Sequence, residues 1–112
     1  MGQYAQAHIE VRFNNNDKAK KFAKIVKNFK KELTKRRIAK GLDTDFDVNI
    51  NSVEIEKLDV RIVLDSGRVQ NAEWQCDEIS EIAKQEFKEF ILDFDATITT
   101  PYGYIYWDGD DE

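Results

Sequence analysis

Residues 5–13 alternate strictly between apolar and polar side chains, and this pattern restricts the possible folds more than any other feature of the chain. Ala5, Ala7, Ile9, Val11 and Phe13 alternate with Gln6, His8, Glu10 and Arg12. Because successive side chains of a β-strand point to opposite faces of its sheet, the pattern predicts a strand with one buried face and one solvent-facing face. A sheet with one apolar face needs a second layer to cover it.

Two longer stretches repeat apolar residues at spacings of three and four, the pattern of amphipathic helices. The first covers 17–40, follows an Asn-rich turn at 14–16, and ends before Gly41, which is placed as a C-cap glycine. The second covers 71–92, with Asn71 as its expected N-cap. The predicted buried stripes are Ala19, Phe22, Val26, Phe29 and Leu33 in the first helix, and Ala72, Cys76, Ile79, Ala83, Phe87 and Phe90 in the second.

Further strand-like segments predict the rest of the sheet. They cover 46–50, 58–64, 94–98 and 104–107, and the change of apolar phase near Asn51 and Ser52 indicates a β-bulge or a break. The resulting order, β-α-β-β-α-β, resembles the ferredoxin-like split βαβ sandwich. We therefore expect an α+β fold with two helices on one face of an antiparallel sheet and an extra C-terminal strand. Residues 1–112 are expected to form a single α+β domain that ends in an acidic tail at 108–112.

Composition limits the class of protein. The 41% hydrophobic content and the seven Phe favour a folded core over disorder. The single cysteine, Cys76, excludes an internal disulfide, and no apolar run approaches the roughly 20 residues of a membrane-spanning helix. Residues 1–10 lack the basic start and apolar run of a signal peptide. The sequence therefore predicts a soluble, cytoplasmic protein with no membrane partner.

Charge is divided between two parts of the chain. Residues 1–40 contain 12 Lys or Arg and 3 Asp or Glu, a net charge of +9, whereas residues 41–112 contain 5 and 19, a net charge of −14. Such a division indicates either a charged partner or two segments that neutralise each other within one fold. The first predicted helix is rich in lysine and the second in glutamate, so neighbouring helices would match part of the charge internally and leave a negative excess.

The negative excess and nearby aromatic residues define the first candidate site. Trp74 is out of phase with the buried stripe of the second helix and in line with Glu78 and Glu81. Asp93 and Asp95 share one face of the following strand. The full predicted partner-binding set is Trp74, Glu78, Glu81, Asp93, Asp95, Tyr102, Tyr104 and Tyr106. Exposed aromatic residues in acidic surroundings favour binding of a protein partner with a basic surface.

We therefore expect a small, acidic, non-catalytic binding protein that regulates or inhibits a macromolecular partner. Its size and charge also fit nucleic-acid mimicry, as in phage-type inhibitors of restriction or CRISPR nucleases, although no motif supports this analogy. The aromatic residues of the last strand fit closure of the core equally well. An edge strand can also pair with its own copy, which leaves a homo-oligomer open.

The first helix supplies an alternative, a nucleic-acid-binding module. The candidate residues are Lys20, Lys24, Lys27, Lys31, Lys35, Arg36 and Arg37. A basic helical face neutralises backbone phosphates and produces salt-dependent binding. Lysine outnumbers arginine in this helix and the rest of the chain is acidic, so the competing interpretation is internal pairing with the second helix.

A third alternative is a calcium- or magnesium-binding or enzymatic module built on the aspartates. Residues 43–54 resemble an EF-hand loop, with oxygen-bearing side chains at loop positions 1, 3, 5, 7, 9 and 12. Against this, Val48 stands at loop position 6, where glycine is needed, and the segment alternates like a strand. His8 is the only histidine, and the only cysteine, Cys76, fits a buried stripe. The chain therefore offers too few suitable side chains for a catalytic triad or a zinc site. We predict no enzyme, no metal site and no cofactor.

Overall fold

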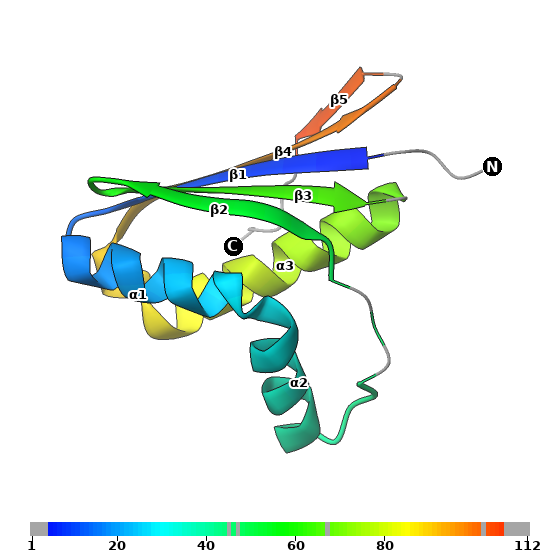
Figure 1. Ribbon diagram of the computed structural model, residues 1–112, viewed down its shortest axis with the longest axis horizontal. Coiled ribbons are helices and arrows are strands. Elements are labelled where there is room, and N and C mark those ends of the chain that lie inside the picture. Colours follow the sequence, from blue (N-terminus) through cyan, green and yellow to red (C-terminus); the bar gives the residue numbers. More distant parts are fainter. Residues whose placement is uncertain (1–4, 45, 47, 67, 102, 107–112) are drawn as a thin grey trace.

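The computed structural model describes residues 5–44, 46, 48–66, 68–101 and 103–106. Helices lie against one face of an antiparallel sheet, an α+β arrangement (Figure 1). The strands are β1 (Ala5–Phe13), β2 (Ile50–Glu56), β3 (Asp59–Ser66), β4 (Ile91–Thr100) and β5 (Gly103–Tyr106). The helices are α1 (Asn16–Lys27), α2 (Phe29–Ala39) and α3 (Val69–Glu86), and a short 3₁₀ helix, η1 (Lys88–Phe90), precedes β4.

The strands lie in the order β2-β3-β1-β4-β5, and each neighbouring pair is antiparallel. β1 has the bounds predicted from its alternation and occupies the middle of the sheet. Ile9 at its centre pairs with Ile62 of β3 and with Ala96 of β4. The α+β class and the antiparallel sheet predicted from the sequence are confirmed.

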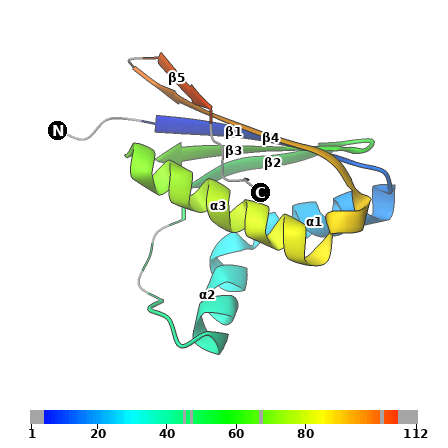
Figure 2. The same cartoon turned by 180° about the vertical axis from the view of Figure 1, so that it is seen from behind.

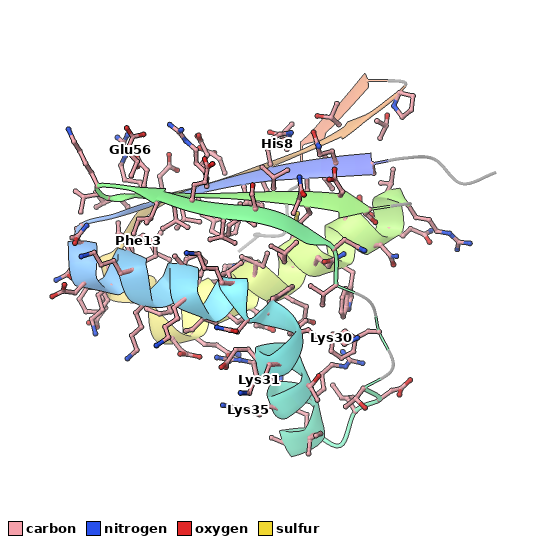
Figure 3. The ribbon with its side chains drawn as sticks, in the orientation of Figure 1. His8, Phe13, Lys30, Lys31, Lys35 and Glu56 are labelled. Carbon is pink, nitrogen blue, oxygen red and sulfur yellow. The ribbon has the colours of Figure 1, made fainter. Side chains whose placement is uncertain are left out.

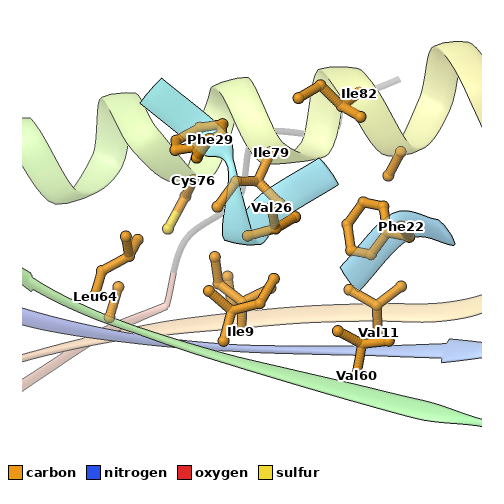
Figure 4. Close-up of a cluster of buried hydrophobic side chains, with 14 of the residues drawn as sticks. Ile9, Val11, Phe22, Val26, Phe29, Val60, Leu64, Cys76, Ile79 and Ile82 are labelled. Atoms are coloured by element: carbon orange, nitrogen blue, oxygen red, sulfur yellow. The ribbon is translucent and has the colours of Figure 1, made fainter. Parts of the chain in front are cut away.

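α1 and α3 cover the same face of the sheet, while no described helix lies on the opposite face (Figures 1 and 2). The core lies between these layers, where β1 and β3 meet the helices (Figure 4). The apolar face of β1 is buried along its whole length, and Val60, Ile62 and Leu64 of β3 continue it. Every residue of the two predicted helical stripes is buried except Phe90, which is half-buried.

Three phenylalanine rings join the end of β1, the middle of α1 and the residue that caps the end of α3. The ring centroid of Phe13 lies 5.4 Å from that of Phe22 and 6.0 Å from that of Phe87, and the last two lie 5.5 Å apart. The rings meet tilted or edge to face, the arrangements that aromatic quadrupoles favour. Because all three side chains are buried, this cluster fixes both helices relative to the central strand.

The single helix predicted over 17–40 is wrong, because the chain bends at Asn28. α1 ends at Lys27 and α2 begins at Phe29, while Asn28 has φ −109° and ψ 37°. The Asn28 side chain donates a hydrogen bond to the backbone oxygen of Lys24 at 3.1 Å, so it competes with the helical backbone bonds. α2 consequently turns away from the sheet (Figure 1).

α2 is anchored near its beginning and projects at its end. Phe29 and Leu33 are its buried residues. After the helix, Gly41 adopts φ 72°, and the amide of Leu42 donates to the backbone oxygen of Arg37 at 2.8 Å. This bond belongs to a Schellman motif and confirms the predicted C-cap glycine. The projecting end exposes two aliphatic side chains, Ile38 and Leu42.

The N-cap predicted at Asn71 is wrong. α3 begins at Val69, and its N-cap residue is Arg68, which makes no side-chain cap bond. The Oγ atom of Ser66 instead accepts from the Arg68 amide at 3.3 Å and donates to the Arg68 backbone oxygen at 3.0 Å. These two bonds link Ser66, the last residue of β3, to Arg68, and the helix starts at the next residue.

Two other boundaries differ from the prediction. α3 ends before η1 and does not reach Leu92, because η1 turns the chain into β4. Residues 46, 48 and 49 lie outside the strands, so the strand predicted over 46–50 begins only at Ile50. The irregularity predicted just after this point is confirmed by a register shift between Ile50 and Ser52.

The extra C-terminal strand is present as β5, which pairs with β4. It starts at Gly103, one residue earlier than predicted, where the backbone adopts φ 137°. The predicted acidic tail at 108–112 lies outside the described residues. Of the helices that the structure describes, none is long and apolar enough to cross a bilayer.

Replacing Phe87 by alanine is expected to lower the free energy of unfolding by about 3–5 kcal/mol, because it removes a buried ring and leaves a cavity. Urea unfolding followed by circular dichroism measures this loss. The control is Leu92→Ala, where the side chain is 62% exposed and the expected change is within about 0.5 kcal/mol. Similar losses in both variants would contradict the role given to the three-ring cluster.

Candidate functional site

The bend at Asn28 divides the predicted basic residues into two groups with different surroundings. The first group lies exposed on α1 and α2 and consists of Lys20, Lys24, Lys27, Lys31 and Lys35. Within the described ranges, no carboxylate forms an ion pair with the first four, which we call the lysine surface. The Nζ atom of Lys35 lies 3.8 Å from Oε2 of Glu32 in the same helix. Among the described residues, no ion pair offsets the positive charge of the lysine surface.

The second group, Arg36 and Arg37, is engaged with α3 and the segment before β2. Arg36 forms an ion pair with the carboxylate of Glu86. The Arg37 guanidinium lies over the rings of Phe46 and Trp74, 5.4 and 5.9 Å from their centroids. The internal charge matching predicted between the helices is therefore found at Arg36, while the lysine surface takes no part in it.

Phe46 and Asn49, which lie between α2 and β2, contact α2 and α3 respectively. Lys30 Nζ donates to the backbone oxygen of Phe46 and lies 4.8 Å from the centroid of its ring. The buried side chain of Gln75 in α3 accepts from the Asn49 amide at 3.0 Å and donates to the Asn49 side-chain oxygen at 3.1 Å. These contacts hold Phe46 against α2 and Asn49 against α3.

A groove of about 530 Å³ opens at the bend, between the helices and the end of this segment. It is lined by Lys27, Asn28, Phe29, Lys30 and Lys31 on the helical side and by Val48 and Ile50 on the other. Figure 3 shows Lys30 on the side of α2 toward the connecting segment, and Lys31 and Lys35 on the side away from it. The groove therefore combines three lysine side chains with an apolar wall, and the lysine surface extends from it along α1.

The structure separates the residues of the predicted acidic surface into two groups. Trp74, Glu78 and Glu81 lie on α3, in the helical layer. Asp93 and Asp95 lie on β4, at the positions that alternate with the core-facing residues of that strand. Their side chains therefore belong to the helix-free face of the sheet. The two groups lie on opposite sides of the sheet and form no common surface.

The predicted tyrosines fall at the edge of the described region. Tyr104 and Tyr106 lie in β5, of which the structure describes the backbone. Tyr102 lies outside the described residues. Their role in partner binding therefore stays a prediction.

Trp74 and Glu78 face internal partners as well as solvent. The Trp74 ring is half-buried, and its centroid lies 5.6 Å from that of Phe46. Burial raises the pKa of the Glu78 carboxyl, against the opposite effect of the nearby Lys40 and Arg37. The predicted aromatic and acidic site on α3 is thus partly used to hold α2 and its following segment in place.

The helix-free face of the sheet carries ion pairs between neighbouring strands. Arg12 Nε lies 2.9 Å from Oδ1 of Asp59, and Arg61 Nε lies 3.1 Å from Oε2 of Glu10. The hydrogen bond from Arg12 lowers the pKa of Asp59. Charges on this face are therefore largely matched between β1 and β3.

A hollow of about 200 Å³ on the same face includes His8 and Asp95 in its lining. The charge of Asp93 raises the pKa of Asp95. The exposed His8 places its Nε2 2.9 Å from Oε1 of Gln6. Over the described ranges, no group of three or more His, Cys, Asp or Glu side chains is arranged to hold a metal ion.

The remaining candidates from the sequence are not brought together. Cys76 is buried on the core side of α3, where burial raises its thiol pKa to about 12, and His8 lies on the other side of the sheet. In the segment that resembles a calcium loop, residues 50–54 are extended strand, which does not match the loop-to-helix course of an EF-hand. Asp45 and Asp47 of that segment lie outside the described residues.

Sequence reasoning missed the residues that build the groove opposite the lysines. The alternation over 46–50 predicts a strand that contains Val48 and Ile50, and the sequence pattern indicates no role for Gln75. The available signal was Asn28, a residue with low helix propensity in the middle of a predicted helix. A break there predicts a bend, although not which segment lies beside it.

Comparison with known proteins gives limited information. No family model and no curated protein matches this chain. Among solved structures, it is similar to a chain of the crystal structure of A. aeolicus tRNASec in complex with M. kandleri SerRS, with a TM-score of 0.49 and 14% sequence identity. The similarity covers 88% of this chain and 20% of that chain, so this chain spans about one fifth of its neighbour's length. Similarity at this level assigns neither a family nor an activity.

Glu78→Gln is expected to raise the melting temperature at pH 7. Burial raises the pKa of Glu78 in the folded state above its ordinary value of 4.5, so the folded protein binds this proton more tightly than the unfolded chain does. The stability cost is fully present above the folded pKa and disappears below the ordinary pKa, where Glu78 is protonated in both states. Calorimetric melting at pH 7 and at about pH 3.5 measures the effect, and the difference should vanish at the lower pH.

The matched control is Glu89→Gln, which removes the same charge from an exposed position. It should leave the melting temperature nearly unchanged at pH 7, as surface substitutions usually do. A Glu78→Gln protein that melts at or below the wild-type temperature at pH 7 would show that the contacts of Glu78 with Lys40 and Arg37 outweigh its burial.

Proposed function

We propose that the protein binds nucleic acid through the lysine surface and acts as a non-catalytic binding module. The observation that supports this most directly is the division of the cations at Asn28. Arg36 and Arg37 are used within the fold, whereas Lys20, Lys24, Lys27 and Lys31 are exposed and form no ion pair with any described carboxylate. A cation without an internal partner is free to neutralise the phosphate of a ligand.

The spacing of the lysines also supports a backbone ligand. Lys20 and Lys27 lie seven residues apart on α1, which corresponds to about 10 Å along the helix axis. Lys31 continues the series beyond the bend. Such a row can contact successive phosphates, and lysine contacts of this kind hold a nucleic acid without reading its sequence.

We also infer that the fold is a ferredoxin-like sandwich. Supporting this, the strand order β2-β3-β1-β4 places β1 and β3 in the middle, and helices occupy the β1–β2 and β3–β4 connections. α2 and β5 are then additions to that scheme. Because this fold hosts many unrelated functions, it adds nothing to the choice of ligand.

A non-catalytic role agrees with the positions of the reactive side chains. The Cys76 thiol is buried, and His8 lies across the sheet from it. We propose a cytoplasmic location on the sequence-based expectation alone.

Replacing Lys20 and Lys24 together by glutamine is expected to weaken nucleic-acid binding and to reduce its dependence on salt. The logarithm of the binding constant should fall less steeply with the logarithm of salt concentration, by about 0.7 for each lost contact on a single strand or about 0.9 on a duplex. Fluorescence anisotropy with labelled oligonucleotides over a salt series measures both quantities.

The matched control is Lys84→Gln with Lys88→Gln, which removes the same charge from α3 and η1. The control should keep the wild-type salt dependence. Absence of binding by the wild-type protein at low salt, or an equal effect of both double variants, would contradict the assignment of the lysine surface.

A second candidate function is binding of a protein with a basic surface, the first expectation from the sequence. The observation that favours it is the acidic group on the helix-free face, where Asp95 lies directly opposite Glu10 and beside Asp93. We propose that this face, rather than Trp74, Glu78 and Glu81 on α3, would contact such a partner, since only one of the two groups can meet a flat surface at a time.

Asp93→Asn with Asp95→Asn is expected to abolish capture of basic proteins from a lysate, because it removes the acidic group from the helix-free face. Affinity capture with mass spectrometry compares it with Glu81→Gln and Glu89→Gln, which remove the same charge from the helical layer. Recovery of the same proteins by the aspartate variant would rule out this face as the partner site.

A further inference from the structure

We infer that the nucleic acid bound by this protein is single-stranded, and that one of its bases occupies the groove between the α1–α2 bend and Val48. This inference rests on the proposed function and specifies the ligand of the same site. The feature that supports it is the apolar wall of the groove, formed by Val48 and Ile50, because phosphate binding alone does not require such a wall.

The groove matches the two chemical parts of a nucleotide. Its volume of about 530 Å³ lies in the range of about 300–1,000 Å³ that is typical of sites for small molecules. Lys27, Lys30 and Lys31 line one side, and the half-buried side chains of Val48 and Ile50 line the other. A phosphate near Lys27 and Lys31 would leave the attached base facing the aliphatic wall.

The wall is held in place before any ligand binds. Asn49, next to Val48, bonds twice to the buried Gln75, and its backbone oxygen accepts from the Asp65 amide at 2.9 Å. On the other side, the bond from Lys30 to the backbone of Phe46 fixes the same segment to α2. A wall fixed from both sides lowers the entropy that binding would otherwise cost.

Only a single strand can use such a groove readily. A duplex keeps its bases paired and stacked, so it presents phosphates to a lysine surface and no free base to an apolar wall. Single strands expose their bases, and proteins that bind them pack these bases on side chains beside a positively charged groove. The lysine surface along α1 would supply that path, and the groove would seat one unstacked base.

The first test measures the binding of the wild-type protein to ligands of equal length and label. Single-stranded DNA, single-stranded RNA and duplex DNA of about 12 nucleotides or base pairs are compared by anisotropy at one salt concentration. We expect both single strands to bind roughly tenfold more tightly than the duplex, because only an unpaired base can bury apolar surface against the aliphatic wall. Equal or tighter binding of the duplex would overturn the inference.

The second test uses competition and does not depend on any variant. Adenosine monophosphate should displace the labelled single strand at a concentration at least several-fold lower than inorganic phosphate does, because it supplies a base as well as the anion. Equal potency of the two would overturn the inference that a base occupies the groove.

The third test replaces an apolar side chain of the wall by a polar one and measures the binding of both ligands. Val48→Ser should weaken single-strand binding to the level of the duplex and leave duplex binding unchanged. The matched control is Val63→Ser, a half-buried valine that lines the hollow on the helix-free face, and it should bind as the wild type does. If Val48→Ser keeps full single-strand affinity, the wall has no role in binding.

These outcomes separate the inference from the proposal beneath it. Binding that depends on Lys20 and Lys24 but not on strandedness or Val48 would overturn the inference and leave the proposed function standing. Binding that does not depend on Lys20 and Lys24 would contradict both the inference and the proposed function.

Discussion

Burial of one face of the central strand is the constraint on which the rest of the structure depends. Every second residue from Ala5 to Phe13 is at most 1% exposed, and β3 and β4 pair with β1 on either side. At one end, Phe13 contacts Phe22 of α1 and Phe87, the residue that caps the end of α3. The positions of both helices are therefore tied to the phase of a single nine-residue strand.

The second organising feature is the bend at Asn28. It divides the basic residues of 17–40 into a group that is paired within the fold and a group that stays exposed. Without the bend, the basic residues of 17–40 would lie along one straight helix. With it, α2 turns its arginines toward α3 and the Phe46 ring, while the lysines of α1 stay exposed. The same bend, together with the segment that Gln75 holds, creates the groove. The bend at Asn28 thus determines both where the exposed positive charge lies and where the groove forms.

The central strand and the fold class could be predicted because their signals are local. Strict alternation set the bounds of β1, and the phase change near Ser52 marked the irregularity in β2. The bend was missed because the apolar spacing continues through it, from Val26 to Phe29 to Leu33, so periodicity alone could not reveal it. The positions of Phe46 and Gln75 depend on tertiary contacts, which no pattern in the sequence encodes.

The candidate sites were predicted less well, for a similar reason. Trp74 and Glu78 were correctly placed off the buried stripe of their helix, but their contacts come from α2, whose direction was not foreseen. Asp93 and Asp95 were correctly placed on one strand face. Their separation from α3 follows from Phe94 and Ala96, which face the helices, so the sequence did contain this information. The sequence identified the exposed lysines. It did not identify Val48 and Ile50, the apolar wall of the groove that three lysines line.

The ion pairs between β1 and β3 on the helix-free face have a consequence for the size of the fold. A sheet that is apolar on both faces must be covered twice, as in three-layer α/β proteins. Here Arg12 with Asp59 and Arg61 with Glu10 give the β1–β3 part of the second face a hydrated surface of matched charge. The protein can therefore remain two layers thick, and stacking of two such faces would require stripping water from every one of these pairs.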